Sequence, residues 1–429
     1  MLIEFTVGNY RSFKEPVTFS MVAADLKGTN EPVDANNVFQ VNDKLKLLKS
    51  AAIYGANASG KSNLARAMMF MRWFMINSSR QTQTTDKIQV EPFLLSLETE
   101  QEPSLFEIVI IIEEKQYRYG FEVTTDRVIA EWLFHVPKKR ESELFSREKD
   151  KISMTKTFKA DGIDKKTRHN ALFLSVAAQF NVAIAEKILQ EFDHRISITS
   201  GLNDENFSQY TLDCLVSNIH TEEIIKFVQK LDLNIKTLEF DTFDKKDIQF
   251  PKNAPDDFKQ FFLNDTADGM IFVYALHNKF DAQGNIISQE LFDVAKQESE
   301  GTKKIVALSG FLIEVLKNGE TMIIDEFDAR LHPLISKAII ELFNSSESNP
   351  NNAQLIFMTH DTNLLDPKLF RRDQIWFTEK NRYGATDLYS LAEYNVKNDA
   401  SFESDYIKGR YGAIPFVGNL SSILKSSDD

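Results

Sequence analysis

Several features that would assign a protein to a particular class are missing from this 429-residue sequence. Its single cysteine, Cys214, excludes an intramolecular disulfide. No run approaches eighteen apolar residues, and no N-terminal stretch joins a basic end to an apolar segment and a cleavage site. We therefore expect a cytoplasmic chain without a membrane span. The 42% hydrophobic and 26% charged content is ordinary for a globular protein.

The charge balance is acidic, with a formal net charge of -13. This charge opposes broad attraction to a nucleic-acid backbone, although a local basic groove is compatible with it. The short basic clusters are interrupted or flanked by acidic or apolar residues, which is typical of a solvated surface. Direct nucleic-acid binding therefore stays open.

The most informative motif present is a glycine-rich run that fits G-x-x-x-x-G-K-[ST] and follows the apolar stretch at 47–54. Glycines let successive backbone N–H groups surround phosphate oxygens, a lysine neutralises the β and γ charges, and a serine hydroxyl can bind Mg²⁺. Residues 62–75 read as the helix whose N-terminus faces the phosphates. The sequence thus predicts a site for ATP and Mg²⁺ built from Gly55, Asn57, Ala58, Ser59, Gly60, Lys61, Ser62 and Asn63.

The remaining pattern predicts an α/β chain in four parts. Residues 1–136 combine the P-loop with alternating strands at 2–7, 17–22, 104–109, 117–123 and 130–136. Residues 137–289 form a charged insertion with long helical patterns at 172–192 and 220–231 and a turn at 281–285. Residues 290–391 regain an α/β rhythm with helices at 301–318 and 333–343 and strands at 321–324 and 354–358, and 392–429 form a tail.

Two apolar strands of the third part end in chemically useful residues. The first ends in Asp325 and Glu326, at the edge of a parallel sheet where nucleotide sites lie. Asp325 can hold the Mg²⁺ shell, and Glu326 can orient or deprotonate the attacking water. The second strand is followed by His360, which can reach a γ-phosphate or serve as a structural histidine.

A further anion site is predicted where 298–302 precede a helix. The Ser299 hydroxyl and the free N–H groups near Glu300 and Gly301 suit an anion, and an ordinary N-cap explains the same residues equally well.

The order of these motifs resembles the ABC-type ATPase heads of the SMC, RecF and OLD families. It is closer still to the AAA-family ATP-binding proteins of bacterial phage defence, the AbiL/RloA-like abortive-infection ATPases. The stretches that carry the resemblance are I-E-F-T-V-G-N-Y-R-S-F-K, I-Y-G-A-N-A-S-G-K-S-N-L, S-E-G-T-K-K, I-I-D-E-F-D-A-R-L-H-P, F-M-T-H-D-T-N-L-L-D, D-Q-I-W-F-T-E-K and G-R-Y-G-A-I-P. They lie at both ends of the chain, and the insertion carries little of the match.

The resemblance implies a P-loop NTPase of ABC-ATPase-head type with an antiparallel β subdomain and a largely helical insertion. It implies a homodimer, or a higher even oligomer, that encloses ATP between protomers and hydrolyses it. Lys61, Glu326 and His360 would then be catalytic, Ser62 and Asp325 would hold Mg²⁺, and Asp328 would match the D-loop. Ser299, Glu300 and Gly301 would come from the partner as the signature motif, which departs here from L-S-G-G-Q. The Q-loop glutamine stays open among Gln81, Gln83 and Gln89.

Two functions from different classes fit this resemblance. One is an anti-phage ATPase that controls a separate, co-encoded effector such as a nuclease and responds to a phage-derived trigger. The other is a RecF- or SMC-like repair ATPase that binds DNA itself. Acidic balance and the lack of sustained heptads favour the first. Because only about seventy residues follow His360, we expect any nuclease to be on a partner.

Overall fold

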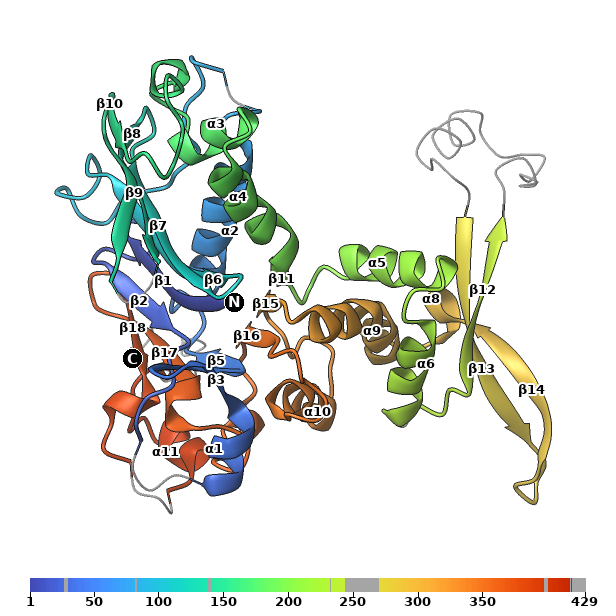
Figure 1. The fold of residues 1–429 in the computed structure, drawn as a ribbon. Helices are drawn as coiled ribbons and strands as arrows, with labels where there is room; N and C mark the ends of the chain where they lie inside the picture. Colours follow the sequence, from blue (N-terminus) through green and yellow to red (C-terminus); the bar gives the residue numbers. More distant parts are fainter. Residues whose placement is uncertain are drawn as a thin grey trace, which may run out of the picture. The chain divides into compact units, whose positions relative to one another are not determined.

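The computed structural model describes residues 1–26, 30–81, 83–137, 140–231, 233–243, 270–396, 400–416 and 418 (Figure 1). These residues divide into two compact units. Unit 1 comprises Met1–Gly201, Asn318–Asp328 and Ser336–Asp429, and unit 2 comprises Leu202–Lys317 and Ala329–Ile335.

Unit 1 contains a six-stranded, mostly parallel sheet. Its strands are β11 (Ile196–Ser200), β15 (Thr321–Asp325), β16 (Gln354–Met358), β5 (Ser50–Tyr54), β17 (Ile375–Lys380) and β18 (Thr386–Ser390), in that order. Only the β17–β18 pair is antiparallel. Every residue of β5 and β16 is buried, as expected for strands covered on both faces. The predicted strands at 321–324 and 354–358 are confirmed.

A seven-stranded antiparallel sheet forms the second layer of unit 1. Its order is β10 (Lys151–Met154), β9 (Ser142–Glu148), β8 (Val128–Val136), β7 (Lys115–Val123), β6 (Ser104–Ile112), β1 (Leu2–Gly8) and β2 (Val17–Ser20). The predicted antiparallel subdomain is therefore present, including the β1–β2 pairing at the N-terminus.

Helix α2 (Lys61–Asn77) joins the two sheets through one continuous core. Its Phe70 and Phe74 pack on Phe106 and Phe121 of the antiparallel sheet. Ile356 of β16 belongs to the same cluster. The P-loop helix is thus anchored along its length, which fixes the loop at its N-terminus.

The first segment of unit 1 runs to Gly201 and so extends past residue 137, where the sequence analysis starts the insertion. Residues 142–200 supply β9, β10, α3 (Phe173–Gln179), α4 (Ala183–Arg195) and β11. The single helical pattern predicted at 172–192 is interrupted at Asn181, whose φ of 61° is left-handed. A buried ion pair between Glu131 of β8 and Arg147 of β9 also ties this segment to the sheet.

Unit 2 is an α+β unit that combines the later part of the predicted insertion with the helix that follows it. Its helices are α5 (Glu205–Val216), α6 (Thr221–Lys230), α8 (Val294–Gln297) and α9 (Glu300–Asn318). A three-stranded sheet orders β12 (Thr237–Phe243), β13 (Met270–Phe280) and β14 (Ile286–Asp293), and the predicted turn at 281–285 joins the last two. Figure 1 shows β13 and β14 as a long hairpin.

The tail predicted at 392–429 is partly built into unit 1. Helix α11 (Phe402–Ile407) brings Tyr406 onto Phe377 of β17, with stacked rings 5.4 Å apart. Tyr411 is also buried. The remaining elements are α1 (Glu31–Asn37), β3 (Val38–Asn42), β4 (Leu45–Leu48), α10 (Pro333–Asn344) and short 3-10 turns at Asp164–Lys166, Thr362–Leu364, Arg372–Gln374 and Leu391–Glu393. No helix in the described ranges is long and apolar enough to cross a membrane.

Candidate nucleotide-binding site

The glycine-rich loop connects the end of buried β5 to the start of α2, all within unit 1. Gly60 adopts a φ of 119°, which L side chains rarely reach. A Cβ at this position would lie 2.5 Å from the Thr386 Oγ1 atom of β18. Thr386 Oγ1 donates to the Ser59 carbonyl at 2.7 Å, and Ser59 Oγ lies 2.6 Å from Thr378 Oγ1 of β17. The β17–β18 hairpin therefore braces the loop from behind.

Lys61 is held where its charge can meet an anion. Its Nζ donates to the Gly55 carbonyl at 2.7 Å and to the Ala56 carbonyl at 3.3 Å, and the residue is only 7% exposed. Burial lowers the pKa of Lys61 to about 8, and the nearby carboxylates, Asp325 first, partly offset this effect. An anionic ligand would supply the negative charge that this buried ammonium lacks.

The ends of β15 and β16 bring three predicted residues to the same edge. These strands pair in parallel, with Ile324 opposite Phe357, so that Asp325, Glu326 and His360 follow side by side. Glu326 has a left-handed φ of 54°. Partial burial lowers the pKa of His360 and the Lys61 charge lowers it further, while the Asp328 and Asp325 carboxylates oppose this shift.

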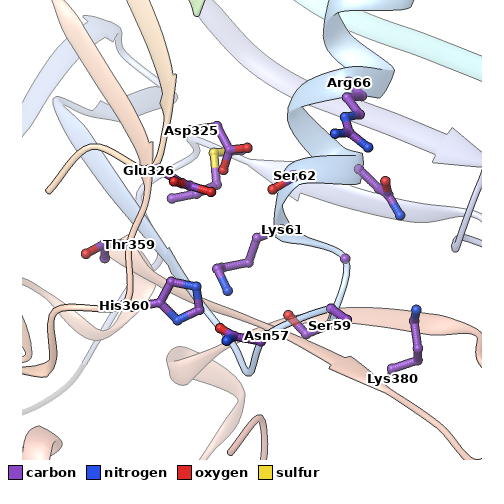
Figure 2. A pocket seen from close by; sticks show the side chains of 14 residues that line it. Asn57, Ser59, Lys61, Ser62, Arg66, Asp325, Glu326, Thr359, His360 and Lys380 are labelled. Atoms are coloured by element: carbon purple, nitrogen blue, oxygen red, sulfur yellow. The ribbon is translucent and has the colours of Figure 1, made fainter. Parts of the chain in front are cut away.

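These segments enclose a cavity of about 450 Å³ (Figure 2). Figure 2 shows the Asp325 and Glu326 side chains across the cavity from the P-loop, with His360 and Lys61 between them and Asn57. Ten predicted residues line this cavity: Asn57, Ala58, Ser59, Gly60, Lys61, Ser62, Asn63, Asp325, Glu326 and His360. Gly55 lies just outside it and contributes the carbonyl that holds Lys61.

Four lining residues were missed from the sequence: Arg66, Met358, Thr359 and Lys380. Arg66 lies four residues after Ser62, so helical periodicity could have placed it on the same face of α2. Lys380 ends β17, the strand that pairs in parallel with β5. The position of Lys380 at the end of an apolar strand could therefore have identified it as a residue of the site.

The predicted signature residues belong to unit 2 and are not among the lining residues. Ser299 Oγ accepts from the Thr302 N–H at 3.1 Å, which is an N-cap for α9. Glu300 pairs with Lys303 at 2.8 Å and with Arg330 at 3.5 Å. Gln81, Gln83 and Gln89 do not line the cavity either.

The donor set suits a divalent cation that shares its ligands with a phosphate. Asp325 Oδ1 is buried and has no hydrogen-bond partner among the described residues, and the Ser62 hydroxyl faces the same cavity. Within the described ranges, no cluster of three or more His, Cys, Asp or Glu side chains could hold a metal alone. Ser62 and Asp325 therefore fit Mg²⁺ only together with oxygens from a nucleotide and water.

Comparison with known proteins bears on these motifs. A family described as "AAA domain, putative AbiEii toxin, Type IV TA system" matches residues 50–366, which include both the P-loop and the two strand ends. No curated protein matches the chain.

Among solved structures, the chain is similar to the SMC head domain from Thermotoga maritima, with 11% identity, a TM-score of 0.41, and coverage of 91% of this chain and 98% of that one. An SmcHead bound to the C-winged helix domain of ScpA gives 13% identity and a TM-score of 0.42, with 91% and 97% covered. An Smc head domain from Pyrococcus furiosus with an extended coiled coil, bound to the C-terminal domain of ScpA, gives 13% identity and a TM-score of 0.38, with 96% and 98% covered.

Proposed function

Because the chain belongs to the AAA-domain family whose model spans residues 50–366, we propose that it binds ATP in the cavity of Figure 2 and hydrolyses it. The observation that carries this proposal is the convergence of Lys61, Asp325, Glu326 and His360 on one cavity, although they lie up to three hundred residues apart. A phosphate-binding loop alone would explain binding. The carboxylates opposite it supply what hydrolysis needs.

Each residue then has a defined task. The P-loop N–H groups and Lys61 hold the phosphates, and Glu326 orients or deprotonates the attacking water. His360 lines the cavity and can donate a hydrogen bond from a ring N–H to a γ-phosphate oxygen. Mg²⁺ held by Ser62 and Asp325 would neutralise developing phosphate charge.

The test is to separate binding from turnover. Glu326→Gln should keep ATP affinity and lose hydrolysis, because an amide preserves the shape but cannot accept a proton. Glu347→Gln, an exposed acid outside the cavity, is the matched control. Affinity is measured by calorimetry and turnover by phosphate release. Hydrolysis by Glu326→Gln at the parent rate would reject the catalytic assignment.

We also propose that two copies enclose ATP, with Ser299, Glu300 and Gly301 of one copy completing the other's site. The exposed position of Ser299 at the N-terminus of α9 supports this proposal. Mixing Lys61→Ala with Ser299→Arg protomers should restore one intact composite site and part of the activity, whereas each variant alone has none. If verified mixed dimers recover no hydrolysis, the signature does not act in trans.

For the cellular role, we propose that this ATPase belongs to an anti-phage system and controls a separate effector. We propose that the effector is a nuclease encoded by a neighbouring gene. The family description, which refers to a toxin of a type IV TA system, supports a role in such a toxic system. Expressing the chain alone and with its genomic neighbour during phage challenge tests the division of labour. Full protection by the chain alone would refute it, and salt-sensitive duplex-DNA retention on filters would favour the repair-ATPase alternative.

A further inference from the structure

Gly201 makes an unusually close approach to the acidic end of β15. It is buried and directly follows β11, whose Ser200 pairs in parallel with Asp325. The Gly201 N–H donates to the Asp325 carbonyl at 2.6 Å. A Cβ at Gly201 would overlap the Glu326 carbonyl oxygen and would lie 2.9 Å from its carbon and 3.2 Å from the Asp325 oxygen. Only a residue without a side chain allows this packing.

The backbone of Glu326 is fixed on both sides. The peptide before it is held by Gly201 through the Asp325 carbonyl, and the peptide after it is held by the Phe327 N–H, which donates to the Met358 carbonyl at 3.1 Å. Between these anchors Glu326 adopts its left-handed φ of 54°, which a non-glycine residue adopts only when its surroundings impose it. The direction of the Glu326 side chain in the cavity therefore depends on where β11 ends.

We propose that Gly201 is a positioning residue for Glu326. It acts through the backbone, because it does not line the cavity and packs against the main-chain atoms of Asp325 and Glu326. The inference rests on the proposed function, since it assigns Gly201 to the hydrolytic step. It adds a residue that lies outside every motif of the nucleotide site.

The test compares Gly201→Ala with a substitution of another crowded glycine elsewhere in the chain. Gly310 lies on α9, where a Cβ would come within 2.7 Å of Thr211 Oγ1 and 2.9 Å of its Cα. We expect Gly201→Ala to lower kcat about a hundredfold, the size of effect produced by a misplacement of about 1 Å, with ATP affinity unchanged. Gly310→Ala should change the free energy of unfolding, but it should not lower kcat selectively while leaving ATP affinity unchanged.

A double variant shows whether the effect passes through Glu326. In a Glu326→Gln background, Gly201→Ala should reduce the residual rate no further, because the group that it displaces is already disabled. Three results would each overturn the inference. Gly201→Ala could lower kcat by the same factor in the parent and Glu326→Gln backgrounds, it could lower ATP affinity by as much as it lowers kcat, or it could leave kcat within twofold of the parent value. The proposed function fails separately, if Glu326→Gln alone leaves turnover intact.

Hydrogen exchange on the unaltered chain covers the case in which Gly201→Ala does not fold. The Gly201 and Phe327 N–H groups should both exchange slowly, since each donates to a backbone carbonyl at this strand end. Exchange of the Gly201 N–H as fast as that of an exposed turn would contradict its role as an anchor.

Discussion

Replacing Gly60 with alanine should damage the nucleotide site by two separable effects. The first is conformational, because a φ of 119° places an L residue in a region that costs about 1–3 kcal/mol. The second is steric, because the new methyl group would meet Thr386 Oγ1 at 2.5 Å and Cγ2 at 2.6 Å. Moving Thr386 would break its hydrogen bond to the Ser59 carbonyl, worth about 1 kcal/mol.

Together these effects amount to about 2–4 kcal/mol in favour of a loop that does not cradle phosphate. If binding must restore the native loop, ATP affinity falls between about 30-fold and 700-fold. Calorimetry or a fluorescent nucleotide measures this fall directly. Gly162→Ala is the matched control, because Gly162 also has a positive φ of 79° but nothing lies within 4 Å of its added Cβ.

Thr386→Ala separates the two effects, because it removes the Oγ1 and Cγ2 atoms that the new methyl group would meet. Gly60→Ala should therefore cost about 1 kcal/mol less in the Thr386→Ala background than in the parent chain. The φ strain remains in both. Unchanged ATP affinity in Gly60→Ala, or strictly additive effects in the double variant, would refute bracing of the loop by the β17–β18 hairpin.

Three further outcomes are expected. Lys61→Ala should abolish measurable ATP binding in calorimetry, because the triphosphate loses its buried cation, and near-parent affinity would reject the P-loop assignment. Lys380→Ala should weaken ATP binding by about tenfold at low salt and by less at high salt, because this lysine is an exposed cation at the cavity. A loss of affinity that does not depend on salt would show that the charge of Lys380 is not its cause. Glu131→Ala should lower the free energy of unfolding of unit 1 by about 3–5 kcal/mol, measured by urea unfolding. The substitution leaves the buried Arg147 guanidinium without its carboxylate and removes the acceptor of the Phe173 and Leu174 N–H groups. A parent-like unfolding curve would contradict this prediction.

Sequence reasoning succeeded where the chemistry is local. The spacing of the P-loop fixes a strand, a loop and a helix within about thirty residues, so α2 was expected at 62–75 and extends over Lys61–Asn77. The strand ends before Glu326 and His360 could be read in the same way. Parallel pairing of two apolar strands was enough to predict that these residues share an edge.

Prediction from the sequence failed where tertiary packing outweighs local composition. Strand β9 and the turn into β10 are rich in charged residues, which made this segment resemble a connector. Arg147 is nevertheless buried, because Glu131 on the neighbouring strand compensates its charge. Thr386 and Gly201 carry no motif at all. Their importance lies in close contacts with residues more than a hundred positions away in the sequence, which no local pattern encodes.

The route of the chain between its units indicates how binding and hydrolysis could be controlled separately. The chain enters unit 1 at Asn318, runs through β15 and leaves after Asp328, and it also leaves unit 1 after Gly201. Two of the four crossings therefore flank β15, a third lies at Gly201, whose N–H donates to the Asp325 carbonyl, and the fourth precedes Ser336. The P-loop belongs to the segment Met1–Gly201, which is continuous within unit 1. Because three of the four crossings adjoin β15 or Asp325, we expect partners that dock on unit 2 to change ATP turnover more than ATP affinity.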